Sequence, residues 1–370
     1  MEKYGFNLEQ IREKRDKLRF LLSNNVLTIE ERETISSSID ACESILKNFE
    51  EDEELSLDDL SKSELLDEVK EFVTEDDYND ESKFVRDNVC SLLSKLICKK
   101  DSSFSFTELN LTNEEAVELV GDMIKSKLGM NHYNIFKNLF IKQKNHIEFS
   151  DIFSSSLIFV PSTKEAYSII HNHSDIAKAS DLAHEAGHYF SSTVSKSIML
   201  DYSVLDEVES IFYELLFIDF LIEENINRDD AKALFSELIT SSIQRAYILD
   251  MEFNYPMYKL NSIRDFKVMA NKYDLYNITE IFNSKDLLNW INIYNNENPF
   301  MYVYSFLIAL EFYEQYKSNR NKKAVVSKYE KFISQIGMIP DFRLASCVSR
   351  DYIGFEGYKT LRKYKSKYVK

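Results

Sequence analysis

The chain of 370 residues carries a formal net charge of −17 and contains 7 Gly and 4 Pro. This length is enough for two or three packed units. Folds rich in β-sheet need many tight turns, and such turns are built largely from Gly, Pro and Asn. The scarcity of Gly and Pro therefore excludes an all-β protein and predicts a mainly α fold with few connections.

Most of the negative charge falls in one stretch, because residues 50–87 contain 17 acidic and 4 basic residues. Such a run is typical of a solvated helical face with connecting loops, and a docking surface for a basic partner is the alternative. An acidic surface repels phosphate groups, so we expect no nucleic-acid ligand.

The cysteines and the apolar runs bear on the cellular compartment. Cys42, Cys90, Cys98 and Cys347 show no C-x-x-C spacing, which favours reduced thiols over disulfides or a zinc knuckle. The N-terminal residues lack the pattern of a signal peptide. The longest uncharged apolar run, Pro299–Leu310, is too short to cross a bilayer. We therefore expect a soluble, cytoplasmic protein with no membrane partner.

Apolar periodicity predicts helices over residues 8–22, 28–46 and 84–97. We expect them to form an N-terminal helical region over 1–108, with a boundary near residues 101–103. The rest of the chain, 109–370, is predicted to be a second helical domain.

The second domain is predicted to begin with a capping box at Thr112 and Glu115, a threonine followed three residues later by a glutamate. Residues 147–160 are rich in aromatic and β-branched side chains and end at Pro161, so they are the best strand candidate. Further helices are predicted at 132–142, around 184–188, and at 204–223, 228–249, 278–290, 302–316 and 323–336.

The motif His184-Glu185-Ala186-Gly187-His188 carries the most specific chemistry. Two imidazoles four residues apart lie on one face of a helix and can bind a single metal ion. The glutamate between them can take a proton from a water molecule on that ion. The chain has 6 His, so a chance match is improbable.

A catalytic zinc takes three protein ligands and keeps one open position, so a third ligand is needed. A carboxylate on a following helix is the best candidate. We expect Glu207, which lies in an apolar segment, and Glu209 is the competitor. Glu214 lies two helical turns after Glu207, where it can either hydrogen-bond a ligating imidazole or be a surface acid.

Two segments carry a family resemblance: Leu182-Ala183-His184-Glu185-Ala186-Gly187-His188 and Asp206-Glu207-Val208-Glu209-Ser210. They resemble the oligoendopeptidase F and thimet oligopeptidase group of zinc metallopeptidases. Segments 111–140 and 299–304 are similar to the helix pair and the tyrosine-rich segment of that group. The resemblance implies a helical zincin-type fold with a small β element before the motif helix, one Zn²⁺ ion and a peptide substrate.

The resemblance also implies roles for individual residues. Zinc is held by His184, His188 and Glu207, and Glu185 is the general base and acid of peptide hydrolysis. Tyr304 is expected to hydrogen-bond the oxyanion. Tyr302, beside it, is the lesser candidate for that role. From the residues alone, His173, which precedes the motif in an H-x-H pair, is expected to line the cleft or lie on the surface, whereas His132 and His146 are expected to be structural.

The chain departs from the family in several places. Its N-terminal part is shorter, and Asn295, Asn296 and Glu297 stand where the family has a histidine before the tyrosine segment. Two alternatives stay open. One is an ImmA-like regulatory protease with a single protein client, and the other is a non-catalytic, metal-containing peptide-binding protein. Intact Glu185 argues against the latter.

Overall fold

The computed structural model of the chain describes residues 7–23, 27–50, 85–90, 93, 96, 106–107, 111–195, 203–254, 299–348 and 355–368. The helices are α1 (Leu8–Leu22), α2 (Ile29–Glu50), α6 (Asn113–Lys127), α7 (Met130–Phe140), α8 (Ala177–Val194), α9 (Val208–Glu223), α10 (Arg228–Asn254), α14 (Pro299–Ser318), α15 (Lys322–Ile333), α16 (Asp341–Ala345) and α17 (Phe355–Tyr368). Short π- and 3₁₀-helical turns lie at Arg86–Cys90 and Lys144–His146. The strands are β1 (Ile147–Ser150), β2 (Ser156–Val160) and β3 (Glu165–His171).

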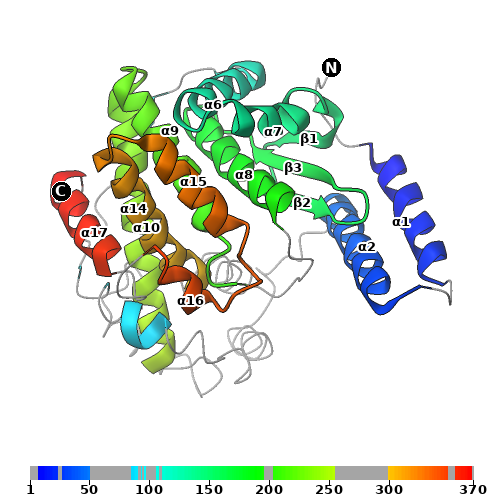
Figure 1. Cartoon of the computed structure of the whole chain (residues 1–370). Helices are drawn as coiled ribbons and strands as arrows, with labels where there is room; N and C mark the ends of the chain where they lie inside the picture. The colour runs from blue at the N-terminus through cyan, green and yellow to red at the C-terminus, as the bar shows by residue number, and fades with distance from the viewer. Residues whose placement is uncertain are drawn as a thin grey trace, which may run out of the picture.

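The prediction of a mainly helical fold with a small β element before the motif helix is confirmed (Figure 1). The mainly apolar α9 is the central helix, and it packs against α6, α8, α10 and α14. Of its 16 residues, 13 are buried. A helix that is apolar on all sides can be stable only when other elements surround it. The few polar side chains on α9 are therefore buried too, and they need partners.

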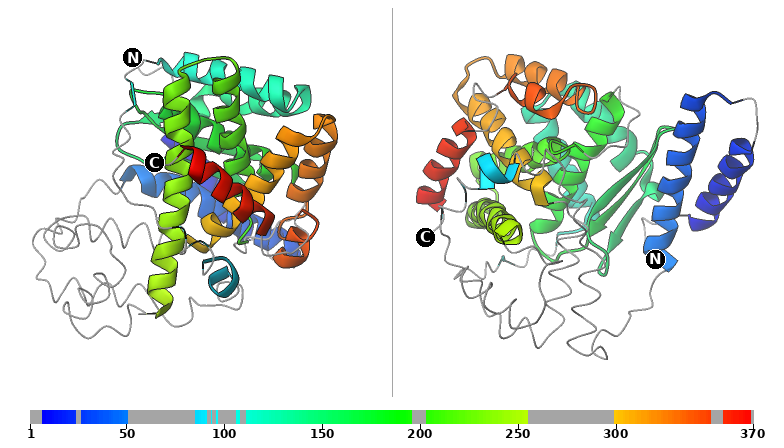
Figure 2. Two further views of the ribbon diagram at one scale, coloured as in Figure 1. Left: turned by 90° about the vertical axis from the view of Figure 1, so that its left-hand side faces the viewer. Right: turned by 90° about the horizontal axis from the view of Figure 1, so that it is seen from below.

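The three strands form a sheet in the order β1-β3-β2, with β1 parallel and β2 antiparallel to β3. One side of the sheet packs on α8 and the other on α2, as the right-hand view of Figure 2 shows. The α1–α2 hairpin makes its own apolar cluster, in which Ile11, Ile39 and Ile45 pack with Val160 and Tyr167 of the strands. The N-terminal helices thus contact the sheet.

The prediction of one strand over 147–160 was wrong in its extent. Ser150 ends β1, because its hydroxyl accepts hydrogen bonds from the amides of Ile152 and Phe153 at 3.2 and 3.1 Å and so turns the chain. A second strand begins at Ser156. Strand β3 was not predicted, although its five central residues are buried, as in a strand covered on both faces.

Most predicted helices are present, with shifted ends. The capping box is confirmed, since the Glu115 amide donates to Thr112 Oγ1 at 3.2 Å and the Thr112 amide donates to Glu115 Oε2 at 2.9 Å. The helix expected from residue 204 begins at Val208, because the Asp206 carboxylate accepts from the Ser203 amide at 2.8 Å and holds a turn there. Helices α16 and α17 were not predicted.

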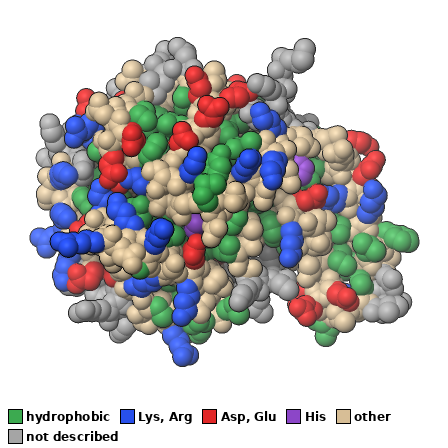
Figure 3. Space-filling view, turned by 45° about the horizontal axis from the view of Figure 1, so that its top comes forward, with side chains coloured by type: hydrophobic (Ala, Val, Ile, Leu, Met, Phe, Trp, Pro, Cys, Tyr) green, Lys and Arg blue, Asp and Glu red, His purple; other side chains and the backbone are tan. Residues whose placement is uncertain are grey.

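Some predictions lie outside the described residues. These are the helix at 278–290, the segment 295–297, part of the helix at 84–97, and nearly all of the acidic stretch 50–87. The division into 1–108 and 109–370 stays a prediction. On the face of the molecule in Figure 3, acidic and basic side chains are interspersed. No helix within the described ranges is long and apolar enough to cross a bilayer.

Candidate metal centre

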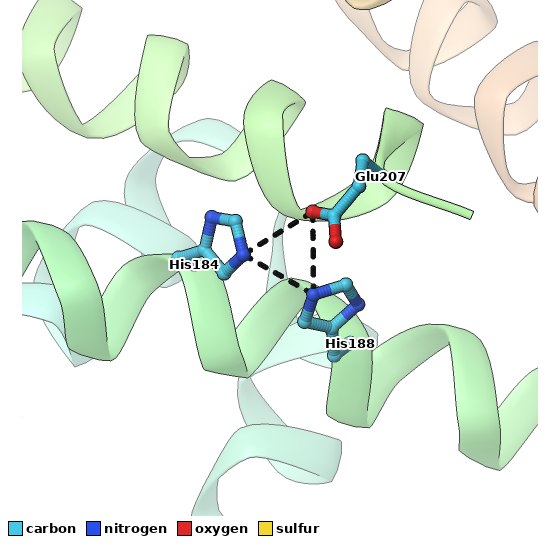
Figure 4. Close-up of side chains that lie close together, drawn as sticks. All are labelled: His184, His188 and Glu207. Atoms are coloured by element: carbon cyan, nitrogen blue, oxygen red, sulfur yellow. Dashed lines mark hydrogen bonds and ion pairs between the residues drawn. The ribbon is translucent and has the colours of Figure 1, made fainter. Parts of the chain in front are cut away.

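Helix α8 presents His184 and His188 on one face, one turn apart, and Glu207 at the N-cap of α9 points at both (Figure 4). The two Nε2 atoms are 3.2 Å apart. Glu207 Oε2 lies 3.3 Å from Nε2 of His184 and 3.4 Å from Nε2 of His188. The three atoms form a nearly equilateral triangle.

The triangle has the size that zinc requires. Bonds of about 2.0–2.1 Å at tetrahedral angles place neighbouring ligand atoms about 3.3–3.4 Å apart. The donor set of two imidazoles and one carboxylate is that of a catalytic zinc site. Among the described residues, this is the group of three that could hold a metal ion. The residues present therefore fit one zinc ion with a position left for a fourth ligand.

The two imidazoles are oriented by carboxylates behind them. Nδ1 of His184 donates to Glu214 Oε2 at 3.2 Å, and Nδ1 of His188 donates to Glu209 Oε1 at 3.3 Å. These bonds fix the tautomer that leaves each Nε2 lone pair free for a metal. Glu214 occupies the supporting position proposed for it from sequence. Glu209, the expected competitor of Glu207, supports His188 instead, and sequence reasoning did not find that role.

The site is built to stabilise positive charge. Burial acts to lower the pKa of His184, but the carboxylates of Glu214 and Glu207 outweigh it and raise that pKa well above its usual value. The same negative charges would favour a cation bound between the imidazoles. Glu207 is itself fixed, because Ser210 Oγ donates to its Oε2 at 2.6 Å and its amide donates to Ser305 Oγ at 3.3 Å.

Gly187 allows α9 to approach α8 closely enough for Glu207 to reach the histidines. A Cβ at this position would lie 2.7 Å from the Glu209 carbonyl oxygen and 2.7 Å from Ser210 Cα. Backbone atoms at that distance cannot give way as a flexible side chain can. The glycine of the motif is therefore a packing requirement of the metal site.

Glu185 lies next to the triangle and is 2% exposed. Burial raises its pKa to about 7, against the opposing effect of the two histidines. Its Oε2 has no hydrogen-bond partner among the described residues. A buried carboxylate with one unpaired oxygen and a pKa near neutrality is suited to exchange a proton with a ligand.

The two tyrosines considered as oxyanion donors lie in different surroundings. The structure favours Tyr302 over Tyr304, which was the first choice from the sequence. Tyr304 is 0% exposed and packs in the core, with its ring centroid 6.1 Å from that of Phe342. Tyr302 and Glu185 both line a pocket next to the triangle, and the guanidinium carbon of Arg245 lies 4.1 Å from the centroid of the Tyr302 ring. Positions two apart on a helix face different ways, and α14 turns Tyr302 toward the pocket.

His173, His132 and His146, the other histidines considered in the sequence analysis, each have a partner in the structure. His173 lines the pocket, and its Nε2 is 3.4 Å from Asp181 Oδ2. His132 is buried, with Nδ1 2.7 Å from the Tyr213 hydroxyl, and His146 Nδ1 donates to the Ala166 carbonyl at 3.1 Å. His173 is thus the one of these three that faces the site.

No family model matches the chain, and no curated protein sequence matches it. Solved structures do share its fold. PZ peptidase A with an inhibitor aligns with a TM-score of 0.57 and 11% identity, over 97% of this chain and 66% of that one. A protein of Bacillus anthracis str. Ames assigned as an oligoendopeptidase F has a TM-score of 0.55 and 14% identity, over 98% and 64% of the two chains.

A protein of Chlamydophila abortus assigned as a peptidase also aligns, with a TM-score of 0.51 and 16% identity, over 98% of this chain and 63% of that one. The chain spans less than two thirds of the length of these three proteins. At these identities the likeness establishes the fold, which is that of three solved proteins described as peptidases.

Proposed function

We propose that the chain is a zinc-dependent peptidase that hydrolyses short or unstructured peptides. The main observation behind the proposal is the triangle of His184, His188 and Glu207. Beside it lies the buried carboxylate of Glu185, one oxygen of which has no hydrogen-bond partner among the described residues. A structural zinc site closes its fourth position and has no use for a base there. The peptidase fold of the three similar structures supports the same reaction class.

In this proposal His184, His188 and Glu207 hold the ion. When bound, zinc supplies a Lewis acid that polarises the peptide carbonyl and lowers the pKa of a water molecule toward neutrality. Glu185 would accept the proton of the attacking water and deliver it to the departing amine. Tyr302, at the pocket wall, would donate a hydrogen bond from its phenol to the carbonyl oxygen as negative charge develops there.

The test is Glu185→Gln, which keeps the size of the side chain and removes its basicity. We expect peptidase activity to fall by roughly 10³-fold or more, while the zinc content stays unchanged. Glu224→Gln, at an exposed position outside the pocket, is the matched control and should keep full activity. Unchanged turnover in Glu185→Gln would refute the assignment.

A cleavage assay with many peptides distinguishes the peptidase from the two alternatives. The zinc-loaded protein is incubated with a diverse peptide mixture, and cleavage sites are read by mass spectrometry. A general peptidase cleaves many unstructured peptides. A regulatory protease of the ImmA-like kind leaves them intact but cleaves one client protein, and a binding protein cleaves neither.

A further inference from the structure

A pocket of about 420 Å³ opens beside the metal-binding cluster. Helix α8 contributes Ser180, Asp181 and Glu185 to its lining, and α10 contributes residues from Leu234 to Arg245. Helix α9 adds Ile211, Glu214 and Ile218. Because His184 and Glu185 also line it, a peptide at the proposed metal site would have part of its length in this pocket.

The pocket is rich in carboxylates. Five of them line it, from Asp175, Asp181, Glu185, Glu214 and Glu237. The basic side chains in the lining are one arginine, Arg245, and the two imidazoles of His173 and His184. Negative charge therefore exceeds positive charge along the pocket wall.

At one end of the pocket, three carboxylates share a single imidazole, that of His173, whose pKa they raise. His184 is held by Glu214 and His173 by Asp181. The guanidinium of Arg245 lies over the Tyr302 ring. Arg245 follows Glu237 by eight residues on α10, so the two residues are about 12 Å apart along the helix axis. The acidic end is thus formed by Asp175, Asp181 and Glu237.

Glu237 is the most available of these carboxylates. It is exposed at the pocket, and no described side chain forms a hydrogen bond or ion pair with it. Burial of part of the side chain raises its pKa, and the nearby charges of Glu214, Asp181 and Asp175 raise it further, against the opposing effect of His173. A positive ligand would relieve this repulsion.

A second observation points to a ligand in the same pocket. Glu185 is 2% exposed, yet its Oε2 lacks a hydrogen-bond partner among the described residues. An unpaired buried carboxylate oxygen is costly, so its natural complement is a group that enters the pocket. The carboxylates of Glu207 and Glu214 next to the histidines would offset much of the charge of a bound zinc.

We propose that the pocket receives a cationic group of the peptide, either a Lys or Arg side chain or a free amino terminus, and that Asp181 and Glu237 determine this preference. The inference rests on the proposed peptidase function and names its substrate class. Asp181 is held in place by Ser155, whose hydroxyl donates to Oδ2 at 2.6 Å, and Glu237 faces the pocket from α10.

The test uses the zinc-loaded, full-length protein and three peptides that differ in one cationic group. The first is N-acetylated and contains Lys near the cleaved bond, the second is N-acetylated with norleucine in place of Lys, and the third has norleucine and a free amino terminus. We expect kcat/KM for one or both cationic peptides to exceed that of the neutral peptide by about tenfold. The arm that shows the increase identifies the source of the cation.

Glu237→Gln and Asp181→Asn should reduce this ratio to within about threefold of one, and Glu224→Gln should leave it unchanged. Because Glu237 is exposed, its variant is expected to fold. A ratio near one in the unaltered protein, or a ratio that both variants leave unchanged, overturns the proposal.

Binding separates this inference from the proposed function. In the Glu185→Gln protein, the affinities for the same three peptides are measured by calorimetry, without turnover. If the unaltered protein cleaves all three peptides at equal rates, the charge preference is overturned and the peptidase assignment stays intact. If no peptide is cleaved, the assignment fails, and the relative affinities still decide whether the pocket selects a cation.

Discussion

The backbone of Glu209 lies against Gly187 so closely that a Cβ on Gly187 would be 2.7 Å from the Glu209 carbonyl oxygen. This contact sets the distance between α8, which carries both histidines, and the first turn of α9, which follows Glu207. The geometry of the metal site thus depends on the absence of one methyl group.

Gly187→Ala is predicted to separate the two helices and enlarge the triangle of ligands. We expect zinc affinity to fall by at least about tenfold, and the free energy of unfolding to fall by roughly 1–3 kcal/mol, as for overpacking in other cores. Zinc titration with a competing chelator and denaturant unfolding measure the two effects.

Gly121→Ala is the control, because its Cβ would meet the rings of Phe136 and Tyr133 at 3.3 Å, and side chains can shift slightly. Its zinc affinity should equal that of the unaltered protein. Equal zinc affinity in Gly187→Ala would contradict the role of this contact.

Glu214→Gln and Glu209→Gln are predicted to weaken zinc binding without removing a ligand. Each carboxylate accepts a hydrogen bond from the Nδ1 atom of a ligating histidine, at 3.2 and 3.3 Å. Glutamine keeps an acceptor oxygen but loses the negative charge; mutation of such a partner typically costs 10- to 100-fold in metal affinity, and we expect about tenfold for each variant. Glu224→Gln should bind zinc normally. Affinities indistinguishable among the three variants would show that the imidazoles need no charged acceptor.

The two tyrosines of α14 are predicted to differ in effect. Tyr302→Phe removes a phenol that lines the pocket, and kcat/KM should fall by roughly 10²-fold with little change in stability. Tyr304→Phe alters a fully buried side chain, so its effect should be on the free energy of unfolding, about 1 kcal/mol, with activity retained. The reverse pattern would restore Tyr304 as the oxyanion donor.

His132 is predicted to make stability fall at acidic pH. Burial lowers its pKa from 6.5 to about 4, and Glu330, which lies 3.0 Å from Nε2, is 38% exposed and screened by solvent. Above pH 6.5 neither the folded nor the unfolded state protonates this ring. Between about pH 6.5 and 4 the unfolded state binds a proton that the folded state does not. The free energy of unfolding therefore decreases as the pH is lowered through this range, by up to about 3 kcal/mol.

Urea unfolding of the unaltered protein and of His132→Gln, across pH 4 to 8, measures this effect. The difference in stability between the two proteins should narrow as the pH falls through that range. A difference that is constant with pH would mean that His132 titrates normally.

Much of the site could be predicted from the sequence because helical spacing determines it. His184 and His188 share a face by periodicity, and Glu214 follows Glu207 by two turns, which places it behind the same histidine pair. The pairing of Glu209 with His188 could not be predicted, since it depends on the rotation of α9 about its axis. That rotation is set by tertiary packing around Gly187.

The tyrosines and the sheet show the same limit. Spacing separates Tyr302 from Tyr304 but does not say which of them faces the pocket, because α14 is apolar on most sides. Strand β3 carries a nearly continuous buried run, and periodicity cannot distinguish such a run from a buried helical segment. The contact between His173 and Asp181 joins two elements whose relative position only the fold determines.

The zinc content of the purified full-length protein shows whether His184, His188 and Glu207 bind a metal. It is measured by elemental mass spectrometry for the unaltered protein and for His188→Ala and Glu207→Gln. We expect about one zinc ion per chain in the unaltered protein and a loss of zinc in both variants. A folded, unaltered protein that binds no zinc when the metal is supplied, or variants that retain it at full affinity, would refute the metal site.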